Sequence, residues 1–101
     1  MTTDLEVKVD SKVKALTKEP ENYSVILLND DVTPMDFVIE LLVKIFRHTP
    51  ETAKDLTIKI HNEGSAVCGV YTYEIAEQKG TEATLLSRNA GFPLNIKIEK
   101  A

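Results

Sequence analysis

A nearly continuous apolar run occupies residues 23–28, Tyr-Ser-Val-Ile-Leu-Leu. β-branched and aromatic side chains favour a strand, and an apolar run without alternation is typical of a strand buried on both faces. Three short polar residues, Asn29, Asp30 and Asp31, end the run. The pattern therefore predicts a central β-strand whose end is marked by one amide and two carboxylates.

Two helices are predicted next, opening at Thr33-Pro34 and at Thr49-Pro50. Threonine suits an N-cap and proline the first helical turn. Apolar residues then recur at helical spacing, first as Met35, Val38, Leu41, Leu42, Ile45 and Phe46, and later as Ala53, Leu56 and Ile60. Gly64 is a natural stop for the second helix. Because the connection is short, the two helices should lie side by side.

Two more strands are predicted in the second half of the chain. Residues 66–71, Ala-Val-Cys-Gly-Val-Tyr, favour the first of them. In the second, Leu94, Ile96 and Ile98 alternate with polar residues, as in a strand with one buried face.

A third helix should connect these strands, with Thr72 at its start and Gly91 and Pro93 at its end. Gly80 lies in its interior, where glycine costs about 1 kcal/mol relative to alanine. This glycine therefore opposes the continuity of the helix, which its apolar spacing otherwise favours.

The predicted order β-α-α-β-α-β indicates an α+β domain: a compact three-stranded antiparallel sheet with three helices packed on one side. Residues 1–21 are dominated by charged residues and threonine, and they are expected to form a flexible N-terminal tail in front of a domain at residues 22–101. A short alternation at residues 7–10 leaves a strand open as the alternative.

The charge of the chain argues against a general nucleic-acid binder. Its 101 residues carry a net charge of −4 at pH 7, whereas contact with phosphates calls for a basic surface. The single cysteine, Cys68, excludes an internal disulfide and favours a reducing compartment. No apolar run is long enough to span a membrane and no signal-peptide core is visible, so a cytoplasmic location is expected.

Asn29, Asp30 and Asp31 are the strongest candidates for binding chemistry. They stand between a strand end and a helix start, beside an apolar helix face, which suits a small cation that carries an apolar group. The alternative is a turn, because Asn and Asp readily bond their own backbone. His61, near the end of the second helix, would add an acceptor nitrogen if the fold brings it close.

Two enzymatic alternatives have weaker support. Asp30, Asp31 and His61 offer the atoms of a metal site, but their spacing matches no known ligand signature. Cys68 lies in an apolar strand pattern without a nearby histidine, which favours a small buried residue over a catalytic thiolate. No enzyme activity and no cofactor are expected.

The chain resembles the ClpS family of adaptors, which bring N-degron substrates to the ClpA unfoldase. The resemblance covers about residues 22–101. It rests on Asn29-Asp30-Asp31-Val32-Thr33-Pro34-Met35 with Phe37-Val38, on Ile60-His61, on Ala66-Val67-Cys68-Gly69-Val70 and on Pro93-Leu94.

The resemblance implies a monomeric binding protein for peptides whose first residue is Leu, Phe, Tyr or Trp. By the same resemblance, the α-amino group and peptide backbone would be held by Asn29, Asp30, Asp31, Thr33 and His61. The pocket for the first side chain would comprise Met35, Val38, Thr57, Ile60 and Leu94. Glu74 and Lys79 would dock on the N-terminal domain of a ClpA-like or ClpC-like AAA+ partner, and the tail would assist delivery.

Thr57 is the clear departure from the family pattern. Family members place here a methionine that closes the pocket and discourages β-branched first residues. With the shorter, polar Thr57, the rim of the pocket should be altered and the preference for the first residue shifted or broadened. The alternative function is a generic peptide- or protein-binding domain whose polar junction is only a turn.

Overall fold

The computed structural model describes residues 21–101. Six elements follow one another: β1 (Asn22–Leu28), α2 (Met35–Lys44), α3 (Pro50–Glu63), β2 (Ser65–Thr72), α4 (Tyr73–Asn89) and β3 (Asn95–Lys100). The predicted order and the α+β class are confirmed. The expected tail and the possible strand at residues 7–10 lie outside the described residues, apart from Glu21.

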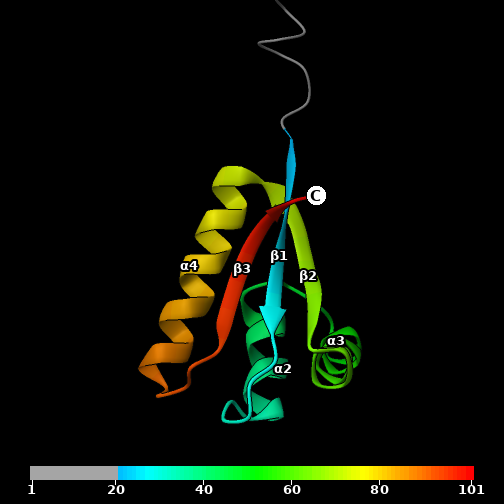
Figure 1. The fold of residues 1–101 in the computed structure, drawn as a ribbon, viewed down its shortest axis with the longest axis vertical. Helices are drawn as coiled ribbons and strands as arrows, with labels where there is room; N and C mark the ends of the chain where they lie inside the picture. Colours follow the sequence, from blue (N-terminus) through cyan, green and yellow to red (C-terminus); the bar gives the residue numbers. More distant parts are fainter. Residues whose placement is uncertain (1–20) are drawn as a thin grey trace, which may run out of the picture.

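The three strands form one antiparallel sheet in the order β2-β1-β3 (Figure 1). β1 is central, as its apolar run predicts, and its Val25 and Leu27 are fully buried. Both face α4, because their partners on β3 are Ile98 and Ile96, which pack beside that helix. A bulge in β2 leaves Cys68 without a partner on β1 and lets this strand curve.

α4 runs through Gly80 without a break, so the predicted third helix is confirmed. A Cβ atom at Gly80 would lie 3.3 Å from Cδ1 of Ile98 and 3.6 Å from Cγ2 of Ile96. The glycine thus allows the helix to approach β3 closely, and this packing offsets its poor helix propensity.

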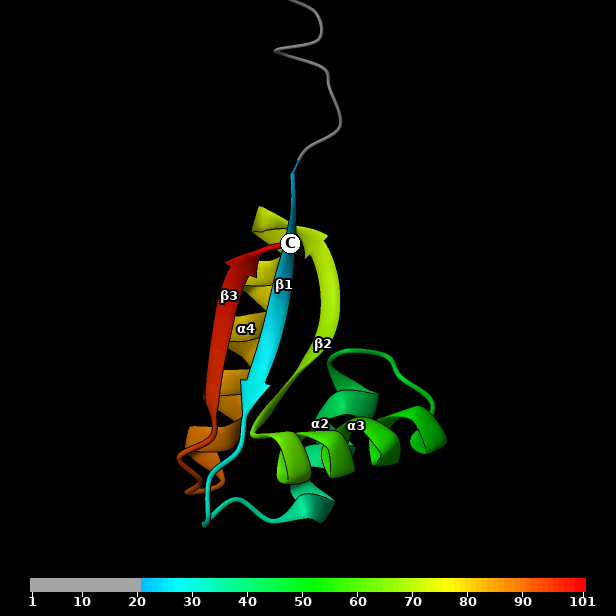
Figure 2. The same ribbon diagram turned by 45° about the vertical axis from the view of Figure 1, so that its right-hand side comes forward.

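α2 and α3 pack against each other at the end of the sheet where β1 finishes, whereas α4 lies along the strands (Figures 1 and 2). Thr49 caps α3 as predicted, accepting a hydrogen bond from the Thr52 N–H at 3.2 Å. Gly64 ends α3 with a left-handed φ of 93°. The layout therefore brings the end of β1, the start of α2 and the end of α3 into one region.

The prediction that Thr33 caps α2 is wrong. Pro34 occupies the N-cap and makes no side-chain capping bond, while the Thr33 hydroxyl donates to Asp30 Oδ2 instead. The Thr33 hydroxyl therefore stabilises the preceding loop and not the start of the helix.

Candidate functional site

One cavity of about 190 Å³ brings together most of the predicted site residues. Its lining comes from the loop after β1, from α2 and from α3, and consists of Asn29, Asp30, Asp31, Thr33, Met35, Val38, Thr57, Ile60 and His61. A backbone hydrogen bond of 2.8 Å from the Asn29 N–H to the Gly64 carbonyl ties the end of β1 to the end of α3. This bond places the polar loop beside His61.

Asp30 organises the loop. Its Oδ1 accepts from the N–H groups of Val32 at 2.8 Å and Thr33 at 2.7 Å, and its Oδ2 accepts from the Thr33 hydroxyl at 2.8 Å. These bonds form the turn that the sequence offered as one alternative, and the same residues line the cavity. A lone pair on Oδ2 remains available to a ligand.

The loop favours the ionised form of Asp30. Partial burial raises the pKa of this carboxyl, but the hydrogen bonds from Thr33 and Val32, together with the charge of Arg88, outweigh burial and bring the pKa below its ordinary value. A fixed negative charge thus stands at the polar end of the cavity.

Arg88, in the last turn of α4, is a residue near the cavity that the sequence analysis does not name. One of its guanidinium nitrogens donates to the carbonyls of Phe92 at 3.0 Å and Leu94 at 2.8 Å. Arg88 thereby fixes the connection between α4 and β3, and its charge acts on Asp30. The available signal was its place in the last turn of a helix, where basic residues bond free carbonyls.

The other wall of the cavity is apolar and graded in depth. Met35 is 42% exposed at the rim, whereas Val38, Thr57 and Ile60 are almost completely buried. The Thr57 hydroxyl donates to the Ala53 carbonyl at 2.8 Å. Thr57 therefore belongs to the inner wall of the cavity.

Leu94 is not among the residues that line this cavity. Only 1% of its surface is exposed, and it belongs to the hydrophobic core together with Val38 and Ile60. Its backbone carbonyl accepts a hydrogen bond from Arg88, while its side chain is part of the core and not of the cavity lining.

The two predicted docking residues lie on α4, away from the cavity. Glu74 is exposed in the first turn. Lys79 is half-buried, and its Nζ donates to the Ile45 carbonyl at the end of α2 at 2.7 Å. Lys79 thus already binds a carbonyl within the chain, whereas the Glu74 carboxylate faces solvent.

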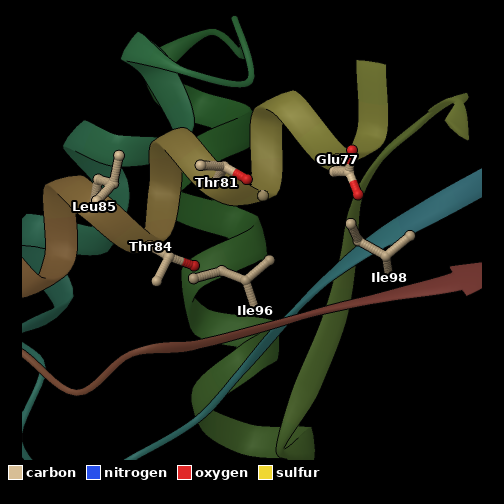
Figure 3. A pocket seen from close by; sticks show the side chains of 7 residues that line it. Glu77, Thr81, Thr84, Leu85, Ile96 and Ile98 are labelled. Carbon is tan, nitrogen blue, oxygen red and sulfur yellow. The ribbon is translucent and has the colours of Figure 1, made fainter. Parts of the chain in front are cut away.

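A second, larger groove of about 300 Å³ lies between α4 and β3 (Figure 3). Its walls are mostly apolar or hydroxyl-bearing, and Glu77 is its only charged residue. Such a groove lacks the converging acceptors that a small cation requires, so the smaller cavity is the better candidate.

The two enzymatic alternatives receive no support. Within residues 21–101, no three His, Cys, Asp or Glu side chains form a group able to hold a metal ion. Cys68 is 1% exposed, and burial raises the pKa of its thiol to about 12.

None of the helices within residues 21–101 has the length and apolar character that a membrane span requires.

Cys68 should therefore be inert in the folded protein. At about pH 8 the thiol stays protonated and shielded, so a disulfide reagent such as Ellman's reagent should react at least about a hundredfold more slowly than with the chain unfolded in guanidinium. Time courses of absorbance in the two states measure this. Fast stoichiometric labelling of the folded chain would contradict the buried position.

Comparisons with known proteins agree with this geometry. The family described as "ATP-dependent Clp protease adaptor protein ClpS" matches residues 18–97. Adapter proteins ClpS from Maricaulis maris and Treponema denticola are 47% and 50% identical, over 89% and 81% of this chain and 83% and 81% of their own length. Agrobacterium tumefaciens ClpS2 bound to L-phenylalaninamide superposes with a TM-score of 0.80 at 43% identity, covering 82% of this chain and all of that one. The chain belongs to the ClpS family of ATP-dependent Clp protease adaptor proteins.

Proposed function

We propose that this chain binds N-degron peptides, which combine a free α-amino group with a bulky first residue such as Leu, Phe, Tyr or Trp, and delivers them to a Clp AAA+ unfoldase. One observation carries the proposal: a single cavity joins a cluster of carboxylate, amide and imidazole acceptors to a buried apolar wall. The ligand of the Agrobacterium relative, L-phenylalaninamide, pairs the matching groups, an α-amino group and a benzyl side chain.

The polar end suits the α-amino group. This group has a pKa of about 7.7–8.0, so it is mostly a cation at neutral pH and offers three N–H donors. Asp30, Asp31 and His61 supply acceptors, and Asn29 adds an amide oxygen. A lysine ammonium also carries charge, but on a long stem that cannot place a bulky side chain in the adjoining apolar pocket.

These interactions imply a reversible complex. A charge-assisted hydrogen bond contributes about 1.5–3 kcal/mol and a buried Leu or Phe side chain roughly 1.5–3 kcal/mol. Three such bonds and one side chain give roughly 6–12 kcal/mol, against an association cost of about 4 kcal/mol or more. A moderate net affinity suits an adaptor that must release its cargo.

Delivery requires a second surface. Glu74 is the stronger candidate for docking on the N-terminal domain of a ClpA-like or ClpC-like partner, because its carboxylate is exposed. Lys79 would have to leave the Ile45 carbonyl to form a new ion pair. The chain would act as a monomer, and residues 1–21 would assist the transfer.

Glu74→Ala should separate the two surfaces. We expect unchanged affinity for a Phe-leading peptide by isothermal titration, and at least about a tenfold loss in the rate of ClpAP-type degradation of a Phe-leading reporter. Glu63→Ala, at an exposed position at the end of α3, is the matched control and should retain both peptide binding and delivery. No binding of the Phe-leading peptide to the unmodified protein would exclude the proposed function.

Thr57 should broaden the accepted first residues. A threonine in the inner wall leaves room that the methionine of other family members would fill, so Ile- and Val-leading peptides should bind within about tenfold of a Leu-leading one. Thr57→Met should weaken Ile and Val binding selectively. Fluorescence anisotropy with Phe, Leu, Ile and Val peptides measures this, and tight Phe and Leu binding without measurable Ile and Val binding would refute the broadening.

A further inference from the structure

We propose that Thr57 recognises the phenolic hydroxyl of a first-residue tyrosine, so that one oxygen atom in the apolar wall favours tyrosine over phenylalanine. This inference rests on the proposed function, because it names which of the bulky first residues the pocket tells apart.

Thr57 is the one hydroxyl-bearing residue in the apolar part of the cavity. The neighbouring wall consists of Met35, Val38 and Ile60, none of which offers a strong hydrogen-bonding group. The other polar lining residues belong to the loop after β1, apart from His61 at the end of α3. A buried phenol in this wall therefore has Thr57 as its available side-chain partner.

The hydrogen-bonding state of Thr57 complements a phenol. Its hydroxyl proton is already engaged, because Oγ1 donates to the Ala53 carbonyl at 2.8 Å. Two lone pairs remain on Oγ1, so Thr57 can accept but not donate while this bond is kept. The O–H group of tyrosine supplies the missing donor.

The spacing along α3 also fits. Thr57 precedes His61 by four residues, so both face the same side of the helix, about 6 Å apart along its axis. The phenolic oxygen of an extended tyrosine side chain lies roughly 6–7 Å from its α-carbon, by standard bond lengths. A tyrosine whose amino group is held near His61 therefore brings its hydroxyl to Thr57.

Phenylalanine makes no comparable demand. The Thr57 proton is satisfied by Ala53 with or without ligand, so a bare ring leaves no buried donor unpaired. A buried phenol without an acceptor would lose the hydrogen bond that it makes in water. Removal of the Thr57 oxygen should thus affect tyrosine alone.

The test compares Thr57→Val, which keeps the shape and removes the oxygen, with Thr57→Ser, which keeps the oxygen and removes the methyl group. Fluorescence anisotropy with otherwise identical Tyr- and Phe-leading peptides gives the affinity ratio. In Thr57→Val the Tyr-to-Phe ratio should fall about tenfold, with Phe affinity changed by less than about twofold. Thr57→Ser should keep the ratio of the unmodified protein.

A peptide led by 4-fluorophenylalanine tests the same point without a variant, because fluorine adds bulk at the same position but no donor. It should bind the unmodified protein as the Phe peptide does. Fluorophenylalanine binding equal to tyrosine, or an unchanged ratio in Thr57→Val, would overturn the inference alone. Failure of both Tyr and Phe peptides to bind the unmodified protein would instead overturn the proposed function.

Discussion

Acetylation of the α-amino group should reduce the affinity of a Phe-leading peptide by at least about a hundredfold. The acetyl group removes the positive charge and leaves one N–H donor of three, so Asp30 and Asp31 lose their cation. A charge-assisted hydrogen bond contributes about 1.5–3 kcal/mol. The loss of two such bonds, about 3–6 kcal/mol, corresponds to a loss of at least about a hundredfold in affinity. The added bulk would also have to enter a cavity of about 190 Å³.

Isothermal titration of the free and acetylated forms of one peptide measures the difference. A peptide with a free amino group and glycine in first place is the matched control, because it keeps the charge and lacks the side chain. It should also bind weakly, since the apolar wall then stays empty. Equal affinity of the free and acetylated peptides would show that the acceptor cluster does not bind the α-amino group.

Asp30→Ala should have the second large effect, again at least about a hundredfold on peptide affinity. The substitution removes the negative charge that faces the ligand. It also leaves the N–H groups of Val32 and Thr33 and the Thr33 hydroxyl without their common acceptor. The loop that carries Asn29 and Asp31 would then lose its conformation.

Asp30→Asn distinguishes the two causes, because an amide oxygen can still accept the backbone N–H groups while the charge is gone. We expect it to lie between the unmodified protein and Asp30→Ala in titrations. Nearly full affinity in Asp30→Asn would mean that loop order matters and charge does not. Unchanged affinity in Asp30→Ala would contradict both roles.

The lowered pKa of Asp30 also predicts how this loop depends on pH. Because the folded pKa lies below the unfolded one, the stabilisation by Asp30 is fully present above the ordinary aspartate range and is lost as pH falls through the folded pKa. The difference in unfolding free energy between the unmodified protein and Asp30→Ala should therefore be constant from about pH 5 to 7 and shrink below about pH 3.8. Urea denaturation at each pH measures it.

Local patterns in the sequence were sufficient for the secondary structure. The apolar run of β1, the Thr49-Pro50 start of α3 and the alternation of Ile96 and Ile98 depend on neighbours in the chain, and each predicted element formed. Gly80 shows the limit of local propensity, since close packing on β3 compensates for the cost of glycine in a helix. The sequence also predicted the turn and the hydrogen-bond acceptors of the polar loop, because Asn and Asp side chains at a strand end both form turns and offer acceptor oxygens.

Only the tertiary structure decided how these pieces meet. The bond from Asn29 to the Gly64 carbonyl spans 35 residues of sequence and brings His61 to the loop, which no local pattern encodes. The same packing placed Leu94 in the core, bound Lys79 to the Ile45 carbonyl and buried Thr57 in the pocket wall. The sequence by itself determined which acceptor and apolar side chains are available to line the cavity. Their distances and depths were set by long-range packing, where many weak contacts between distant segments act together.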